Sequence, residues 1–401
     1  MFYVSCNPGF EKGLEAEIKE IWPWLIETNG QHTQLPYPPM TVEHGGILVD
    51  CPLEMGIQFN FFLKTAHRVL WRLAEFRVRD FPKMFEKVRS LPWEKFLTSH
   101  QIEWSVSASK SRLNHEKRIE ETCSEAFAKA AMKIPMTSEH VHKIFVRVHD
   151  DLCSISLDSS GEHLHKRGWG SRKGEAPLRE TIAAFVLRAL IGPTNPAQLA
   201  QTCLVDPMCG SGTLLLEAAS LFEPNFNRKF DFLYWKNVPK LFKTELWRKN
   251  YKLLKRGGAF AAYRGYDMDE KVIQAARLNF EDMQSQLQIQ IANLEFQKQN
   301  LFEEAAEPLP NQNIWCVSNP PYGERLRVQG QKEFSYDDLL LQMIKKFKPQ
   351  KVGLLLPDKN LVKNIKAPVG FRKSSESSFS NGGLDVVFLI FTAEPLNPPT
   401  H

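Results

Sequence analysis

The strongest candidate for chemistry in this sequence is Asn319-Pro320-Pro321-Tyr322, which directly follows an apolar run, Ile314–Ser318, with the composition of a buried strand. Pro-Pro continues neither a helix nor a central strand, so the chain should leave the sheet at its carboxyl edge, where open α/β sheets bind ligands. The side-chain oxygen of Asn319 and the carbonyl of Pro320 could accept both hydrogens of an exocyclic amine, and Tyr322 could stack on its base. The alternative for a lone tetrapeptide of this type is a rigid turn with a core tyrosine.

A glycine-rich run lies upstream, between a predicted strand, Thr202–Val205, and a predicted helix, Thr213–Phe222. Glycines at such a junction allow close backbone approach, and a helix N-terminus offers free N–H groups. The strand ends in Asp206, which suits a cationic amino group better than a pyrophosphate, and the run lacks the Gly-Lys-Ser/Thr of a phosphate-binding loop. S-adenosylmethionine, an amino-acid-bearing nucleoside, fits both features; a structural turn is the alternative. The candidate cofactor residues are Asp206, Cys209, Gly210, Gly212 and Thr213.

A third polar group, Asp267-Met268-Asp269, follows the next predicted strand, Ala261–Tyr266. An acid at this position can hold two ribose hydroxyls, and Met268 can lie against the face of an adenine. Taken alone, the two acids are better explained as helix caps before Lys271–Phe280. A segment rich in Phe, Trp and Lys, Glu223–Gly258, separates this group from the glycine-rich run and is predicted to be an insertion.

Composition excludes several other classes of protein. With 43% hydrophobic and 24% charged residues, the chain is expected to be globular. No apolar run approaches the ~18 residues of a membrane span, and we expect no membrane partner. The seven cysteines contain no CxxC pair and the histidines show no metal-ligand spacing, so a reducing cytoplasm and no bound metal are expected. Residues 61–179 hold 22 Lys+Arg against 15 Asp+Glu, which is compatible with a phosphate-facing surface or with an ordinary solvated one.

The order of predicted elements indicates an α/β fold in the second half of the chain. Strands alternate with helices from residue 178 onward, which predicts a parallel sheet, and Asn381-Gly382-Gly383 marks a terminal antiparallel hairpin. The first half is predicted to be α+β, with a helix near Arg118–Met132 and a hairpin formed by Ile144–Val148 and Leu152–Leu157. Four glycines within Ser159–Pro177 favour an inter-domain linker there.

The motifs together resemble a known family. Asp206–Thr213 and Asn319–Tyr322 look like motifs I and IV of amino-methyltransferases, and Gly323-Glu324-Arg325-Leu326 narrows the resemblance to bacterial large-subunit ribosomal RNA guanine-N2 methyltransferases. The junction of that family is similar to Leu157–Glu162, His165–Trp169 and Ala176–Glu180. Lys64–Leu70 and Leu91–Trp93 resemble its THUMP RNA-binding domain. The resemblance covers nearly the whole chain.

This resemblance implies a Rossmann-like class I methyltransferase sheet at residues 178–401, a linker at 161–177, a THUMP domain at 61–160 and a ferredoxin-like module at 1–60. It implies that Asp267 takes the ribose and that Asn300 and Leu301 flank the adenine. The loop ending in Glu180 and Thr181 would close over the cofactor. Implied RNA contacts are Lys166, Arg167, Trp169 and Arg325.

The sequence departs from the family at one position, because Asn300 stands where the family usually has Asp. An amide oxygen can still accept from the adenine amine, so we expect cofactor binding to survive. Because the sequence ends soon after the terminal hairpin, we also expect it to lack the second catalytic domain that some relatives carry.

The favoured hypothesis is methyl transfer from S-adenosylmethionine to guanine N2 in structured RNA, with 23S rRNA favoured and tRNA as an alternative. A DNA adenine-N6 or a protein-glutamine methyltransferase would use the same Asn-Pro-Pro-Tyr chemistry but would not need the basic first half. A non-catalytic RNA-binding assembly factor would need no amine-accepting turn at Asn319.

Overall fold

The computed structural model describes residues 1–29, 36–134, 136–172, 174, 178–193, 195–244, 247, 260–303, 313–321, 335–357, 365–381 and 384–395. The chain divides into two compact units. Unit 1 contains Met1–Cys6, Leu14–Leu164 and Arg228–Leu254, and unit 2 contains Asn7–Gly13, His165–Asn227 and Lys255–His401. Each unit therefore includes a segment that the order of the sequence would assign to the other.

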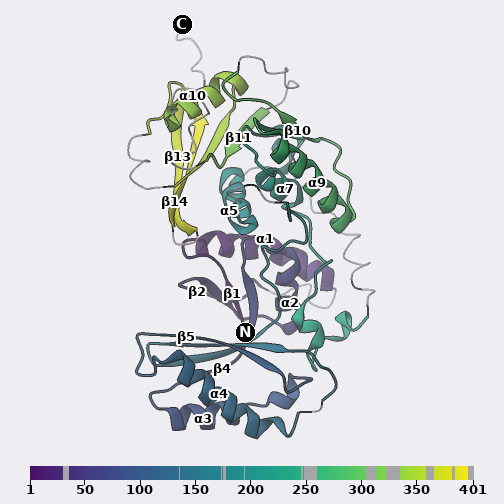
Figure 1. Cartoon of the computed structure of the whole chain (residues 1–401), viewed down its shortest axis with the longest axis vertical. Helices are drawn as coiled ribbons and strands as arrows, with labels where there is room; N and C mark the ends of the chain where they lie inside the picture. Colours follow the sequence, from purple (N-terminus) through teal and green to yellow (C-terminus); the bar gives the residue numbers. More distant parts are fainter. Residues whose placement is uncertain are drawn as a thin grey trace. The chain divides into compact units, whose positions relative to one another are not determined.

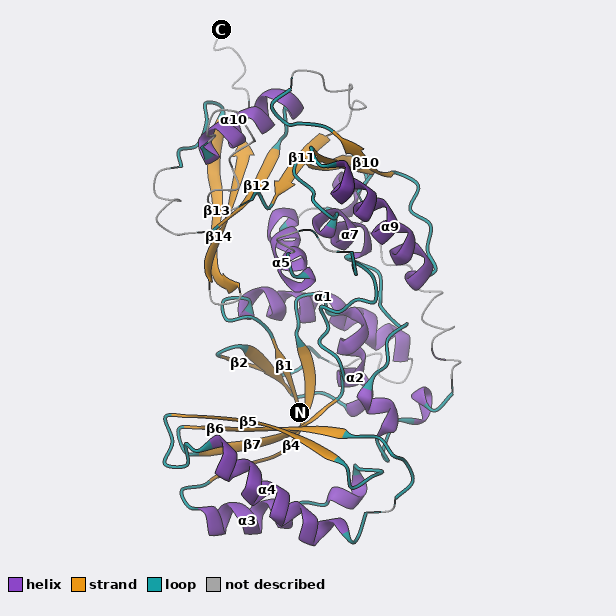
Figure 2. Ribbon diagram, in the orientation of Figure 1, coloured by secondary structure: helices purple, strands orange, loops and turns teal. Residues whose placement is uncertain are grey.

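Unit 1 is built on one seven-stranded sheet with the order β2-β3-β1-β4-β7-β6-β5 (Figures 1 and 2). Neighbouring strands are antiparallel except β5 and β6, which are parallel. The strands are β1 (Phe2–Ser5), β2 (Met40–Glu43), β3 (Gly46–Val49), β4 (Arg68–Arg77), β5 (Ile102–Ser109), β6 (His142–His149) and β7 (Leu152–Asp158). The helices are α1 (Glu11–Asn29), α2 (Leu53–Phe62), α3 (Phe81–Arg89) and α4 (Glu116–Ala131), with a 3₁₀ turn, η1, at Trp93–Lys95.

The alternation along β6 explains how one face of this sheet is buried. Every second residue from His142 to Val148 is buried, and the residues between them are partly exposed, as expected for a strand with one face on the core. Helix α4 places Ile119, Cys123, Ala126 and Phe127 inside the unit. The hairpin β6–β7 and helix α4 confirm the corresponding sequence predictions.

Buried polar bonds fix the point where β7 ends. Asp158 forms an ion pair with Arg68 of β4. The next two residues, Ser159 and Ser160, are fully buried, and both bond to Asn60, at 2.8 and 2.6 Å. The beginning of the segment predicted as a linker is therefore part of the packed interior of unit 1.

Unit 2 has a second seven-stranded sheet, with the order β10-β9-β8-β11-β12-β14-β13. The first five strands in this order are mutually parallel, and β14 and β13 are antiparallel additions. The strands are β8 (Thr202–Asp206), β9 (Ala262–Asp267), β10 (Leu294–Lys298), β11 (Asn313–Ser318), β12 (Lys351–Leu356), β13 (Phe371–Asn381) and β14 (Leu384–Ala393). The helices are α5 (Glu180–Ile191), α6 (Pro196–Leu199), α7 (Thr213–Ser220), α9 (Glu270–Leu287) and α10 (Tyr336–Phe347).

This topology confirms the predicted Rossmann-like α/β sheet with a terminal hairpin. The strand order reverses direction between β8 and β11, and such a switch point is where open α/β sheets bind ligands at their carboxyl edge. The predicted strands and helices of this half are all present, with ends shifted by a few residues.

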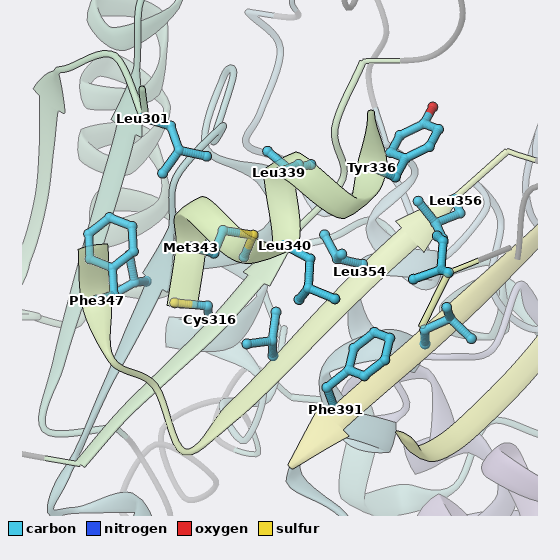
Figure 3. Close-up of a cluster of buried hydrophobic side chains, with 14 of the residues drawn as sticks. Leu301, Cys316, Tyr336, Leu339, Leu340, Met343, Phe347, Leu354, Leu356 and Phe391 are labelled. Carbon is cyan, nitrogen blue, oxygen red and sulfur yellow. The ribbon is translucent and has the colours of Figure 1, made fainter. Parts of the chain in front are cut away.

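Helix α10 covers part of this sheet through a continuous apolar cluster (Figure 3). Leu339, Leu340 and Met343 of the helix pack with Cys316 of β11 and Leu354 of β12 in that cluster. The helix begins with a capping box, in which the Ser335 hydroxyl and the Asp338 carboxylate each bond the other's backbone N–H. The cluster therefore holds β11, and with it the turn at Asn319, against a rigid helix.

The predicted insertion begins after α7, and its residues Arg228–Leu254 belong to unit 1. It contains two 3₁₀ turns, η2 (Asp231–Tyr234) and η3 (Lys240–Phe242). The ring of Phe61 from α2 contacts four aromatic rings of this segment, namely Phe230, Phe232, Phe242 and Trp247. Its aromatic residues are thus core residues of unit 1.

Among the helices that the structure describes, none combines the length and the apolar character needed to cross a membrane.

Candidate active site

Three neighbouring strands of unit 2 end in polar residues at the carboxyl edge of the sheet. β8 ends at Asp206, β9 at Asp267 and β11 at Ser318. The hydroxyl of Ser318 donates a 3.1 Å hydrogen bond to Asp206 Oδ1. This bond places the residue before Asn319 directly against the first residue of the glycine-rich run, as the sequence analysis requires for a joint site.

Asp206 is a fully buried acid with neutral donors. Besides Ser318, its Oδ1 accepts the backbone N–H of Met208 at 3.2 Å. Burial, with a smaller contribution from the nearby carboxylate of Asp267, raises the pKa of Asp206 to about 7 against the lowering effect of the two hydrogen bonds. A positive charge arriving beside this acid would therefore be stabilised by it and would lower its pKa.

The two glycines of the loop have different roles. Gly212 has φ +88°, and a Cβ atom there would lie 2.8 Å from the ring of Phe296 on β10, so the residue permits close packing of the loop on the sheet. Gly210 has φ +51°, yet a Cβ atom there would meet no atom of the described residues within 4 Å. Space therefore adjoins the backbone at Gly210, where a ligand could approach.

Asp267 connects the glycine loop to the end of β9. Its Oδ2 accepts the N–H of Gly210 at 3.0 Å, and its Oδ1 accepts the N–H of Asp269 at 3.0 Å. Burial raises the pKa of Asp267. Asp269 caps α9 by accepting from Lys271 N at 2.8 Å, so the helix-cap interpretation holds for that acid. Met268 between them is 50% exposed, an open apolar side chain beside the loop.

The residues predicted to flank an adenine follow β10. The Asn300 side-chain oxygen accepts from Phe302 N at 3.1 Å and so closes a local turn. Leu301 is buried and belongs to the apolar cluster beneath α10 (Figure 3), which leaves little of its side chain to contact a ligand. The prediction for Leu301 is therefore wrong as far as its side chain is concerned.

Two residues that support this site, Lys346 and Asn279, were not identified from the sequence. The ammonium of Lys346 on α10 donates to the carbonyls of Asn300 and Glu303, at 3.0 and 3.1 Å, and so holds the turn after β10. The amide of Asn279 on α9 donates to the carbonyls of Ser211 and Arg172, at 3.1 and 2.9 Å. A basic residue in the last turn of a helix was the only sequence signal for Lys346, and it names no partner.

Glu180 and Thr181 begin α5, and both are buried. Within the part of the chain that the structure describes, the Thr181 hydroxyl oxygen has no hydrogen-bond partner. Buried hydroxyls are normally bonded, so this oxygen suits a ligand contact. Thr213 begins α7 directly after Gly212.

The turn that is predicted to bind the amine is described only in part. Asn319 and Pro321 are half-buried and Pro320 is buried. Tyr322 and Arg325, predicted to stack on the base and to contact RNA, lie outside the described residues.

The structure corrects the predicted RNA contacts near the junction. Arg167 is 2% exposed and forms a bidentate ion pair with the buried Glu217, with nitrogen–oxygen distances of 3.2 and 3.1 Å. Trp169 is 6% exposed. Both side chains are used inside unit 2 and cannot form an exposed RNA surface, so these two predictions are wrong. Lys166 between the buried Leu164 and Arg167 is exposed, and its contact with RNA stays a prediction.

Comparison with known sequences identifies a family for more than half of the chain. The family described as RMKL-like methyltransferase domain matches residues 167–386. The ribosomal RNA large subunit methyltransferase K/L of Saccharophagus degradans is 26% identical over 97% of this chain and 50% of its own length. The protein of the same name from Pseudomonas paraeruginosa is 29% identical over 86% of this chain and 48% of its own length. The chain thus spans about half the length of these curated relatives.

Solved structures show the same fold across the whole chain. A methylase from Clostridium difficile 630 aligns with a TM-score of 0.77 and 26% identity, covering 100% of this chain and 99% of that one. SMU.472, a methyltransferase complexed with SAH, aligns with a TM-score of 0.74 and 23% identity, covering 99% and 98% of the two chains. On the family match, the strand order and the edge that joins Asp206 to Ser318, this chain belongs to the RMKL-like methyltransferases.

Proposed function

We propose that this chain transfers a methyl group from S-adenosylmethionine to the exocyclic N2 of a guanine in structured RNA, with 23S rRNA as the favoured substrate. The observation that carries the proposal is the bond between Ser318 and Asp206, because it joins the amine-accepting turn to the glycine loop at one sheet edge. The name shared by the relatives, ribosomal RNA large subunit methyltransferase K/L, supports the choice of RNA.

The residues at this edge fit the cofactor. Gly210 leaves space at its backbone, and the buried hydroxyl of Thr181 has no described partner. Asp206 has neutral donors and a raised pKa, which suits the cationic amino group of a methionine moiety. We propose that Asp206, Cys209, Gly210, Gly212, Thr213 and Thr181 hold the methionine end, and that Asp267, Met268 and Asn300 hold the nucleoside end. The bound cofactor would supply an electrophilic methyl group on a sulfonium.

The turn after β11 would prepare the amine. The nitrogen of a guanine amine is a poor nucleophile because its lone pair is delocalised into the ring. Accepting both N–H hydrogens at the Asn319 side-chain oxygen and the Pro320 carbonyl would favour a pyramidal nitrogen and free the lone pair for in-line attack. After transfer the nitrogen is cationic and acidic, so it loses one hydrogen as a proton. Pro321 would keep the turn rigid, and Tyr322 would stack on the base.

Unit 1 would bind the RNA. We propose that it combines the ferredoxin-like module and the THUMP domain implied by the resemblance. Residues 61–164 and 228–254 of unit 1 together hold 25 Lys+Arg against 16 Asp+Glu, and this excess of positive charge supports the proposal, because phosphate contacts dominate RNA affinity.

A nucleoside assay tests the proposal. The purified chain is incubated with methyl-labelled S-adenosylmethionine and, separately, unmodified 23S rRNA, tRNA, duplex DNA and total protein, and each product is digested for chromatography. Label in N2-methylguanosine from 23S rRNA is expected. Label in N2-methylguanosine from tRNA alone would show that the substrate is tRNA and not 23S rRNA. Label in N6-methyladenine of DNA, in protein, or in no acceptor would overturn the proposal.

A further inference from the structure

The segment that Arg228–Leu254 adds to unit 1 has a surface of its own. From residue 229 to residue 243, buried aromatic residues alternate with exposed lysines. Phe230, Phe232, Trp235 and Phe242 are buried, and Lys229, Lys236, Lys240 and Lys243 are exposed. The only acidic residue in this stretch of sequence is Asp231. The aromatic residues anchor the segment, and the lysines give its outer side a positive charge.

Among the aromatic residues of the segment that the structure describes, one is not buried. Tyr234 is 43% exposed, and its ring stacks on the ring of His140 with a centroid distance of 3.9 Å and an interplanar angle of 5°. The carboxylate of Asp231 lies near this histidine, with its Oδ1 3.7 Å from His140 Nε2. Since one face of Tyr234 is covered by His140, its exposure comes from the other face and the edge.

The backbone around Tyr234 is fixed by bonds to other parts of unit 1. The carbonyl of Tyr234 accepts from the Thr98 hydroxyl at 2.8 Å. The N–H of Lys236 donates to the Phe96 carbonyl at 2.9 Å. The ring of Trp235 stacks on Trp71 of β4 at 5.2 Å. An exposed ring held in this way loses little conformational freedom when a flat ligand stacks on it.

We infer that Tyr234 is a stacking platform for an unpaired nucleotide of RNA, and that Lys236, Lys240 and Lys243 contact the neighbouring phosphates. This inference rests on the proposed function, since it locates where an RNA substrate meets unit 1. Aromatic rings set among basic residues are the usual means of binding single-stranded nucleic acid, because every base has a face to stack and every nucleotide a charge. The proposed RNA contact thus lies at Tyr234 and its lysines rather than at Arg167 and Trp169, which are buried in unit 2.

Unit 1 also offers a matched control for an exposed tyrosine. Tyr37 is 58% exposed but lies within the first sixty residues, which hold two Lys+Arg against eight Asp+Glu. A general effect of removing an exposed ring would appear at both positions, whereas a stacking site would be affected only at Tyr234.

The test measures binding of two fluorescent RNAs by anisotropy, a ten-nucleotide oligouridylate and a blunt ten-base-pair duplex. Tyr234→Ala is expected to weaken oligouridylate binding about tenfold and to leave duplex binding unchanged, because duplex bases are already stacked. Tyr234→Phe keeps the ring and, like Tyr37→Ala, should bind as the wild type does. The combined variant Lys236→Gln, Lys240→Gln and Lys243→Gln should reduce the slope of log affinity against log salt by about two.

Thermal melting and S-adenosylhomocysteine binding check that each variant is folded. If Tyr234→Ala is unfolded, Tyr234→Leu, which keeps an apolar contact to His140 but no aromatic face, takes its place with the same expected loss. Unchanged oligouridylate binding in the folded variant would overturn the inference about Tyr234 but would not contradict the proposed methylation of guanine N2. If the wild-type chain bound neither RNA, both the inference and the RNA substrate of the proposed function would fall.

Discussion

Asp158 in unit 1 and Asp206 in unit 2 are similar acids in opposite situations. Each is the last residue of a strand, each is fully buried, and burial raises the pKa of both. Asp158 faces the guanidinium of Arg68, which lowers its pKa against the effect of burial. Asp206 faces only a hydroxyl and a backbone N–H among its hydrogen-bond partners. One acid has its counter-charge within the fold, whereas the other has no cationic partner among the residues that the structure describes.

The presence or absence of an internal cation distinguishes a buried acid that stabilises the fold from one that is suited to bind a ligand. A buried acid with an internal cation can hold two parts of a fold together, as Asp158 does for β7 and β4 in unit 1 and as Glu217 does for α7 and the loop at Arg167 in unit 2. A buried acid without a cation is costly to ionise, and such groups concentrate at sites where a ligand completes the environment. The pKa of both acids lies at about 7, so the same substitution distinguishes them by what it leaves behind: at Asp158 it leaves the buried guanidinium of Arg68 without its partner, and at Asp206 it leaves no cation that the structure describes.

The largest effect is expected from Asp158→Asn. Above pH 7, where Asp158 is ionised because its pKa lies at about 7, it leaves the buried Arg68 without a counter-charge and should lower the free energy of unfolding by at most about 3–5 kcal/mol, measured by urea denaturation at pH 8. The double variant Asp158→Asn with Arg68→Met should recover much of this loss, since no buried charge remains. A single variant as stable as the wild type would show that the pair does not hold unit 1 together.

Asn319→Ala removes one of the two oxygens proposed to accept the amine. It should lower kcat about 100- to 1000-fold, in the range seen when one polar group that stabilises a transition state is removed. Affinity for S-adenosylhomocysteine should stay within twofold, because Asn319 is assigned to the amine. Pre-steady-state methyl transfer and calorimetry measure the two quantities. A variant that retains full kcat would refute the amine-accepting role.

Asp206→Asn should act in the opposite direction to Asp158→Asn. Because the folded pKa of Asp206 (about 7) lies above its ordinary value of 3.8, the folded chain binds this proton more tightly than the unfolded chain. The acid thus favours folding below pH 4, and that contribution is lost as pH rises through 7.

At pH 8 the variant should therefore be more stable by on the order of 2 kcal/mol, less than the full shift implies because the new amide needs partners of its own. At pH 4 the gain should disappear. Cofactor affinity should fall at least tenfold. Chemical denaturation at the two pH values measures the first effect, and a variant less stable than the wild type at pH 8 would contradict the comparison.

The smallest effect is expected from Lys346→Met, which releases the carbonyls of Asn300 and Glu303. Cofactor affinity should fall about threefold to tenfold with kcat unchanged, the cost of one charge-assisted contact. Lys346→Arg should restore part of the affinity. Lys345→Met, an exposed neighbour on the same helix, is the control and should have no effect. An equal loss in both Met variants would indicate a general effect on α10.

The sequence predicted much of unit 2 because its elements follow simple periodicities. Short apolar strands alternate with amphipathic helices, and the polar residues at strand ends mark the carboxyl edge. Strand β4 was missed because a bulge between Arg72 and Ala74 breaks its period-two pattern. Without β4, the first 160 residues could not be recognised as containing a single continuous sheet.

The parts of the site that the sequence did not reveal depend on partners distant in the chain. Arg167 and Trp169 looked like RNA contacts, since nothing near them indicates that Glu217, fifty residues later, lies opposite. The bond from Ser318 to Asp206 and the contacts of Lys346 likewise join separate elements. Residue type and local spacing identify candidate groups, but only the fold shows which are already paired.

Asp206 is proposed to pair with a cationic group of the cofactor at the carboxyl edge of unit 2. Calorimetric titration with S-adenosylhomocysteine at pH 7, in buffers of different ionisation enthalpy, measures the protons exchanged on binding. With the pKa of Asp206 near 7 and lowered by the ligand's ammonium group, the wild-type chain should release about half a proton, and Asp206→Asn should release none. Proton uptake, or the same release from both proteins, would contradict the account.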